Sequence, residues 1–347
     1  MLKPLFVSLK SCLGVLSAAL IPVALQASSF TFTTINDPAD VSLQTPTFNQ
    51  LLGINDEGVI AGYYGDGAII NNHGFTYTGG TFTPENVPGT DQTQVVAINN
   101  VLSSNVYDTA GFSVINATGL NQGFTNVGGA FTNVNGPGSM FTQVLGLNDD
   151  NQAVGFYVAA DGNTLPFLYN LGTKSLTTIS YPSGWDSTSV TAAGINNDGV
   201  IVGFYTDAAG TVFGFIDNGG TFTAPTDPLG TNPMFFGINN NGEIVGDDTA
   251  ADGATEGFVY NMDTNTWTLV ADPSASQVPD GFGISGTTLN GINDQGDLVG
   301  FYADASGNVD GLLVTPTPEP TSVGLFTAAC MLLCAVWARR RRRSSGC

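Results

Sequence analysis

Positive charge is nearly absent from most of this chain. Of the eight lysine and arginine residues among 347, only Lys174 lies between residues 28 and 315. The same segment carries 28 of the 29 acidic residues, which gives it a net charge of −27. A surface of this sign repels phosphate backbones and anionic lipid head groups. We therefore expect no nucleic-acid partner for this segment.

Cysteine and histidine are also scarce. Disulfide bonds cannot stabilise segment 28–315, because all four cysteines lie outside it, at Cys12, Cys330, Cys334 and Cys347. With His73 as the only histidine, zinc, copper or haem ligation and a Cys/His nucleophile are excluded. The segment also lacks a Gly-x-Ser-x-Gly nucleophile elbow and a phosphate-binding loop ending in Gly-Lys-Ser/Thr. These absences favour a protein that is not an enzyme and holds no cofactor.

Both ends of the chain carry apolar segments. Lys3 and Lys10 flank the start of an apolar stretch, Leu13 to Leu25, and small residues follow it from Ala27. This pattern is typical of a secretory signal peptide, which we predict over residues 1–27 with cleavage after Ala27. At the other end, an apolar run from Val323 to Ala338 has about the minimum length for a transmembrane helix.

A short motif and a basic cluster flank the second apolar run. The motif is Pro318, Glu319 and Pro320, and the cluster is Arg339, Arg340, Arg341, Arg342 and Arg343. This order resembles the PEP-CTERM sorting signal of Gram-negative bacteria, to which we assign residues 316–347, transmembrane helix included. The resemblance implies recognition by an exosortase-type membrane protease and removal of the anchor. It also implies export through the inner membrane to the cell surface, the outer membrane or the extracellular matrix. An ordinary C-terminal anchor without sorting is the alternative.

Between the two ends, one motif recurs six times. Gly53-Ile54-Asn55 opens the first copy, and further copies start at Ala97, Gly146, Gly194, Gly237 and Gly291. The starts are 44, 49, 48, 43 and 54 residues apart. Each copy contains short β-strand patterns separated by Gly, Asn and Asp turns, and no helical periodicity. A period of this length built from strands is typical of β-propeller blades with four strands each.

The two ends of the repeat region complement each other. The sixth copy lacks its fourth strand, whereas Phe30 to Pro38 matches the fourth-strand pattern of Thr81 to Pro88. Supplying the missing strand from the N-terminus would close the ring and leave no exposed sheet edge. We therefore predict that residues 28–315 form an all-β, six-bladed β-propeller closed by the N-terminal strand.

A second pattern recurs at the start of the third strand of each copy. It reads His73-Gly74-Phe75 in the first copy, and Gly-Phe returns at Gly123, Gly214 and Gly257. Together with the Gly-Ile-Asn motif, it resembles the bacterial extracellular repeats called HAF. Histidine remains only at position 73, which argues against a role that requires histidine in every blade.

Acidic side chains remain as candidates for chemistry. A glycosidase needs two carboxyl groups about 5–10 Å apart, but most aspartates here fall at hairpin turns, where they bind backbone amides. Calcium is another possibility, because this cation takes several oxygen ligands. The candidate pairs are Asp149 with Asp150, Asp247 with Asp248, and Asp294 with Asp297.

The positions three residues before each repeat start should line the central channel of the propeller. They are Gln50, Gln94, Gln143, Thr191, Met234 and Thr288, a mostly uncharged polar set that suits a hydroxyl-rich ligand. The leading hypothesis is a non-enzymatic secreted or cell-surface propeller in adhesion or in contact with extracellular polysaccharide, as in a biofilm matrix. The alternatives are a secreted carbohydrate-active hydrolase or lyase on the same scaffold, and a calcium-dependent structural matrix protein.

Overall fold

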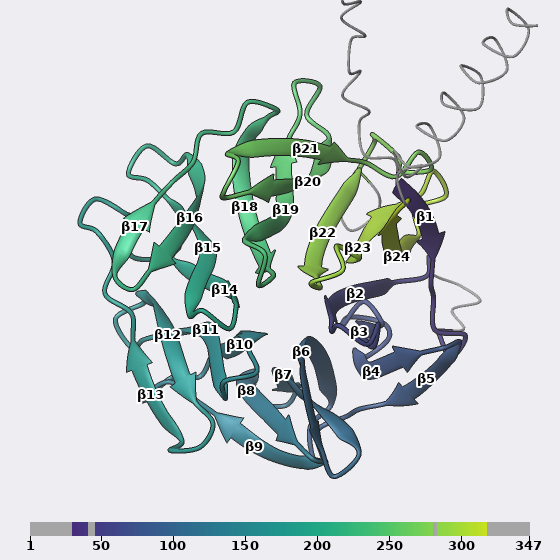
Figure 1. The fold of residues 1–347 in the computed structure, drawn as a ribbon. Coiled ribbons are helices and arrows are strands. Elements are labelled where there is room, and N and C mark those ends of the chain that lie inside the picture. Colours follow the sequence, from purple (N-terminus) through teal and green to yellow (C-terminus); the bar gives the residue numbers. More distant parts are fainter. Residues whose placement is uncertain (1–29, 41–45, 280–282, 318–347) are drawn as a thin grey trace, which may run out of the picture.

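Six four-stranded antiparallel sheets surround a central axis like the blades of a propeller (Figure 1). The computed structural model describes residues 30–40, 46–279 and 283–317. All 24 regular elements in these residues are β-strands, which confirms the predicted all-β, six-bladed β-propeller. The predicted signal peptide, Pro318 to Pro320, the C-terminal helix and the arginine cluster lie outside the described residues. Within the described part of the chain, no helix has the length and apolar character needed to span a membrane.

In blades one to five, the strands run from the axis outwards in chain order, whereas in blade six the first strand of the chain, β1, is outermost. Blade one contains β2 (Asn49–Ile54), β3 (Ile60–Tyr64), β4 (His73–Thr78) and β5 (Thr81–Pro84). Blade two contains β6 (Gln92–Ser103), β7 (Val106–Ile115), β8 (Leu120–Val127) and β9 (Ala130–Val134). Blade three contains β10 (Thr142–Leu147), β11 (Gln152–Val158), β12 (Thr164–Asn170) and β13 (Ser175–Thr178). Blade four contains β14 (Thr191–Ile195), β15 (Val200–Thr206), β16 (Val212–Asn218) and β17 (Thr221–Thr223). Blade five contains β18 (Thr231–Ile238), β19 (Glu243–Thr249), β20 (Thr255–Asn261) and β21 (Thr266–Val270). Blade six contains β22 (Thr287–Ile292), β23 (Leu298–Ala303), β24 (Val309–Pro316) and β1 (Phe30–Thr34).

Blade six is completed by the N-terminal strand, as the sequence predicts. Strand β1 pairs antiparallel with β24, so that Phe32 lies opposite Val314 and Thr34 opposite Leu312. The backbone amide of Ile35 continues the ladder by donating to the carbonyl oxygen of Gly311. Because the first and last described strands share one sheet, the ring closes and the outer edge of β24 is not left unpaired.

The recurring Gly-Phe pattern builds the core of each blade. Phe75 is fully buried and lies opposite Gly62 of the neighbouring strand. A Cβ atom on Gly62 would lie 3.1 Å from the ring of Phe75 and 2.3 Å from the carbonyl oxygen of Gln50. The same opposition of glycine and a buried apolar side chain recurs in every blade, with Leu312 in blade six. The phenylalanine of the pattern therefore fills the core, and the partly exposed ring of His73 lies tilted beside that of Tyr64, at 5.0 Å between ring centroids.

In five of the six blades, glycine at the start of the repeated motif allows the inner strands to approach closely at the axis; blade two carries the small residue Ala97 there. A Cβ on Gly237 would lie 2.6 Å from the carbonyl oxygen of Asn290, and one on Gly194 would lie 2.8 Å from that of Phe236. Cβ atoms do not approach backbone oxygens this closely. The motif thus sets the width of the channel, whose two ends have different side chains.

Candidate functional site

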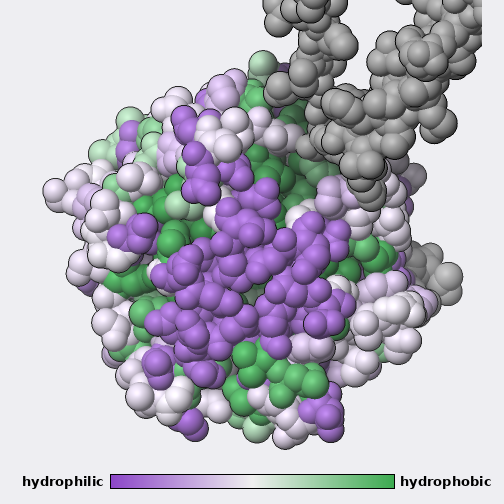
Figure 2. Space-filling model, viewed as in Figure 1, coloured by the Kyte–Doolittle hydropathy of each residue, from purple (hydrophilic) through white to green (hydrophobic). Residues whose placement is uncertain are grey.

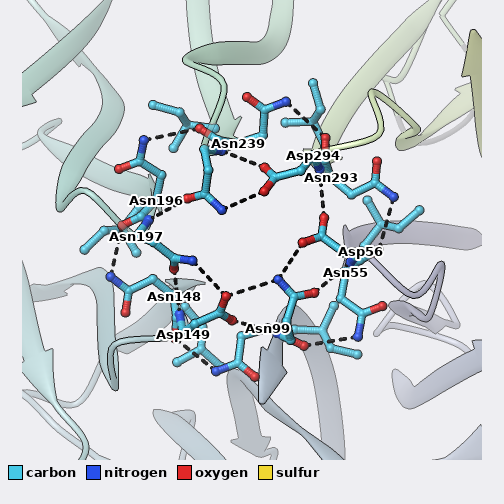
Figure 3. Close-up of a pocket in the computed structure, with 18 residues that line it drawn as sticks. Asn55, Asp56, Asn99, Asn148, Asp149, Asn196, Asn197, Asn239, Asn293 and Asp294 are labelled. Carbon is cyan, nitrogen blue, oxygen red and sulfur yellow. Dashed lines mark hydrogen bonds between the residues drawn. The ribbon is translucent and has the colours of Figure 1, made fainter. Parts of the chain in front are cut away.

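One end of the channel is lined by a ring of asparagines (Figure 3). In every blade, the side-chain amide nitrogen of the motif asparagine donates to the backbone carbonyl oxygen of the equivalent asparagine in the next blade, at 2.9–3.2 Å. These residues are Asn55, Asn99, Asn148, Asn196, Asn239 and Asn293, all buried. The side-chain oxygen of each asparagine accepts backbone amides of its own turn, as Asn55 does from Glu57 and Val59. The hydrogen bonds form a complete circle.

A second circle lies beside the first and uses the next residue of each turn. Each backbone amide donates to a side-chain oxygen in the following blade at 2.7–2.9 Å, through Asp56, Asn100, Asp149, Asn197, Asn240 and Asp294. The three carboxylates converge here, but amide groups satisfy them: Oδ2 of Asp149 accepts from both Asn100 and Asn197. Figure 2 shows the resulting hydrophilic patch at the centre of this face. We assign this end a structural role.

The opposite end of the channel, here called the mouth, is shaped by six β-bulges. In blade one, the pairing of the two inner strands shifts between Leu51 and Gly53, so Leu52 is the additional residue. A bulge turns a side chain away from the regular alternation of the strand. The bulge residues of all six blades line the mouth: Leu52, Val96, Leu145, Ala193, Phe236 and Asn290. These positions are not visible in the sequence pattern, because a bulge breaks the period of two.

A cavity of about 370 Å³ opens at the mouth. Blades two, three and four contribute a polar and an aromatic side chain each, which face each other across the first two strands: Gln94 and Phe112, Gln143 and Phe156, and Thr191 and Phe204. The predicted channel positions are therefore correct for these three blades. The cavity lining does not include Gln50, Met234 or Thr288. Gln50 and Thr288 bind within the protein instead, to the hydroxyl of Tyr63 and the carboxyl of Asp247.

Asn290 distinguishes one side of this cavity from the rest. Its position is apolar in the other five blades, and its buried side-chain oxygen has no hydrogen-bond partner in the protein. A buried polar atom without a partner is destabilising unless water or a ligand binds it. The cavity thus combines apolar walls with a few polar groups that can exchange hydrogen bonds with a ligand.

Blade five departs from the repeat at its second strand. Asp247 and Asp248 occupy positions that are Phe156 and Tyr157 in blade three, and the first position is aromatic in every other blade. Both aspartates are buried. Burial raises the pKa of Asp247 to about 7, against the opposing effect of a hydrogen bond from Thr288. Burial, together with contact with the carboxyl group of Asp227, raises the pKa of Asp248 well above its usual range.

The calcium candidates from the sequence do not gather into one site. Asp247 accepts a hydrogen bond from Thr288 of blade six, whereas Asp248 contacts Asp227 of the loop from blade four. Asp294 binds Asn240 in the second circle, while Asp297 lies next to Asn293. Asp149 belongs to the same circle and Asp150 is exposed. Among the residues that the structure describes, no group of three or more His, Cys, Asp or Glu side chains could hold a metal ion.

Solved structures share the fold at low sequence identity. The SapL1 lectin in complex with alpha methyl fucoside has a TM-score of 0.50 and 10% identity, with 80% of this chain and 97% of that chain covered. An Aleuria aurantia lectin in complex with Fucα1-6GlcNAc has a TM-score of 0.49 and 11% identity, with 81% of this chain and 99% of that chain covered. TolB from Acinetobacter baumannii has a TM-score of 0.48 and 13% identity; 76% of this chain is covered, but only 65% of TolB. No protein-family model and no curated protein matches the sequence. Of these three, the match to the SapL1 lectin supports a shared fold, and no more than that.

Proposed function

We propose that the protein is a secreted, non-enzymatic β-propeller that binds neutral glycans in the cavity at its channel mouth. Its work would be adhesion or contact with extracellular polysaccharide. The observation that carries the proposal is the cavity itself, in which aromatic rings, amides and one hydroxyl surround the unpartnered oxygen of Asn290.

The chemistry of the lining suits a sugar. A pyranose ring presents apolar C–H faces, which pack on rings such as Phe156 and Phe204, and hydroxyl groups around its edge, which pair with amides. Gln94 and Gln143 can each donate and accept hydrogen bonds, and Asn290 can accept one. The net charge of −27 over residues 28–315 disfavours acidic polysaccharides. Neutral glycans therefore fit best.

The arrangement of acidic side chains favours binding over catalysis. No acidic residue is among those that line the cavity. The three carboxylates that converge on the channel do so at the opposite end, where they accept hydrogen bonds from asparagine amides. A hydrolase would need two carboxyl groups facing its substrate.

A glycan-binding screen of the full-length protein in detergent, with neutral sugars and uronic acids, tests this function. Asn290→Leu places in blade six the residue that blades one and three carry, so we expect an unchanged melting temperature but about tenfold weaker binding of a neutral sugar. Phe156→Ala should also weaken binding. Asn218→Leu makes the same chemical change at an exposed position outside the channel and serves as the control. Full binding by Asn290→Leu and Phe156→Ala would reject the mouth as the site.

We also propose that the C-terminal segment is a PEP-CTERM signal processed by an exosortase-type protease. The order of Pro318 to Pro320, the apolar run and the arginine cluster supports this. In a host with such a system, Glu319→Ala should leave the protein full length and in the membrane fraction, as immunoblotting would show. Glu319→Gln tests whether the negative charge itself is required. Normal processing of the alanine variant would leave an ordinary membrane anchor as the explanation.

A further inference from the structure

Two carboxyl groups meet without a counter-charge beside the channel mouth. Asp248 is 3% exposed, and neither of its carboxyl oxygens has a conventional donor in the protein. Asp227 is the neighbouring carboxyl group that acts on Asp248 most strongly, and its Oδ2 atom is also buried without a hydrogen-bond donor. Two ionised carboxylates cannot hydrogen-bond to each other, because neither carries a donor hydrogen. A proton on one of the two groups would supply the missing donor.

The surroundings of the pair offer no cation. The other charged groups that face Asp248 are Glu256, opposite it on β20, and Asp247, next to it on β19, and both are acidic. Between residues 28 and 315 the chain has only Lys174, in the β12–β13 hairpin of blade three, and the single His73 on blade one. The protein itself therefore cannot neutralise the pair, and burial in a low-dielectric interior strengthens the repulsion.

The pair also connects two parts of the fold. Asp227 belongs to the loop from β17 to β18, which joins blade four to blade five, and its Oδ1 atom accepts the backbone amide of Leu229. Gly230 of the same loop packs directly on the carboxyl group of Asp248, where a Cβ atom would lie 2.5–2.7 Å from the carboxyl atoms. The loop leads into the start of β18, at the mouth end of the channel.

We propose that Asp248 is protonated at neutral pH and that its hydroxyl group donates a hydrogen bond to Oδ2 of Asp227. This hydrogen bond holds the loop between blades four and five against blade five, beside the channel mouth. The bond is lost when the proton leaves, and the two carboxylates then repel each other. Alkaline conditions would therefore release the loop, whether or not the mouth binds a glycan.

A proton fits the site better than calcium does. Calcium takes six to eight oxygen ligands, and here only two carboxyl groups meet. The Cα atom of Gly230 covers the Asp248 carboxyl group on one side, which leaves little room for further ligands there.

The sign of the pH dependence follows from the raised pKa. The pKa of Asp248 lies at about 8 in the folded protein and near 3.8 in the unfolded chain. Between these values the folded protein binds more protons at this site, so the contribution of the Asp248 proton to stability is complete below pH 4 and is lost as the pH rises through about 8. Asp247, with a raised pKa of about 7, adds to the same trend.

Thermal unfolding of the full-length protein in detergent between pH 5 and pH 9 tests the proposal. The melting temperature should fall towards pH 9. Asp248→Asn carries a permanent donor for Asp227, so its melting temperature should match the parent at pH 5, exceed it by several degrees at pH 9 and give a flatter profile. Hydrogen exchange of residues 224–231 should accelerate at high pH in the parent protein, after correction for intrinsic exchange, but not in the variant.

Two further variants keep the result interpretable. Asp227→Asn should flatten the profile in the same way, which covers the case in which Asp248→Asn fails to fold. Asp263→Asn removes an exposed acid of the same blade and should give a profile parallel to the parent. Parallel profiles for both pair variants would overturn the proposal. Stabilisation by millimolar calcium at pH 7.5, beyond sodium chloride of equal ionic strength and absent in Asp248→Asn, would show a metal in place of the proton.

Discussion

A single asparagine amide in each blade joins two parts of the ring. Its oxygen holds the hairpin turn of its own blade, and its nitrogen binds the next blade, as Asn148 does with Gln152 and Asn196. Aspartate could replace the oxygen but not the nitrogen, because an ionised carboxylate has no donor. This explains why the first position of the turn is always asparagine, whereas the second position is asparagine in three blades, as at Asn100, and aspartate in the other three, as at Asp149.

Asn148→Asp should therefore destabilise the domain strongly. The new carboxylate would face the carbonyl oxygen of Asn196 where an amide now donates, and a buried acceptor without a donor costs about 1–3 kcal/mol, more for a charged group. Asn135→Asp, at an exposed position in the loop after blade two, adds the same charge and should change the free energy of unfolding by less than about 0.5 kcal/mol. Chemical denaturation measures both. Equal effects would show that charge, and not the circle of amides, decides the result.

At the level of strands, ring closure depends on the five residues of β1. Phe30 and Phe32 pack against the apolar core formed by blades five and six, and the ladder to β24 covers the outer edge of that blade. Without β1, the backbone groups of residues 311–315 would be exposed as a free edge.

Deleting residues 30–35 should lower the free energy of unfolding by several kcal/mol and promote association through the exposed edge of β24. The measurements are calorimetry and sedimentation velocity. Adding a synthetic peptide of residues 28–38 should restore part of the stability if the strand acts through pairing. A truncated protein that stays monomeric and melts at the same temperature would contradict the role of β1.

The sequence predicts the elements of this fold better than it predicts the site. The six copies of the Gly-Ile-Asn-like motif and the incomplete sixth copy are local patterns, and both predict structure correctly. The bulges at Leu52 and its equivalents are not visible in a pattern of period two, so the bulge residues at the mouth were missed. The contact between Asp227 and Asp248 was also missed, because it depends on how a loop of one blade folds over the next. A clue was available: blade five has two aspartates where its neighbours have aromatic residues.

For the molecule as a whole, charge of one sign dominates. With 28 acidic residues and one lysine between residues 28 and 315, nearly every pair of charged side chains in this region repels. The hydrogen-bonded circles satisfy some carboxylates locally, as with Asp149 and Asp294, but they do not remove the charge. Salt should therefore stabilise the domain, because it shortens the range over which exposed charges act from about 30 Å at 0.01 M to about 10 Å at 0.1 M.

We expect the melting temperature at pH 7 to rise by about 5 °C between 10 mM and 300 mM sodium chloride, which corresponds to one or two kcal/mol for a domain of this size. Calcium and magnesium chloride at equal ionic strength should act alike, because the aspartate pairs that the sequence suggested for calcium do not converge in the described structure. The double variant Asp294→Asn with Asp297→Asn removes one of the candidate calcium pairs. If the salts act only by screening, calcium and magnesium should still raise the melting temperature of this variant equally. A larger rise with calcium, lost in this double variant, would instead support a calcium site at that turn and with it a calcium-dependent matrix protein.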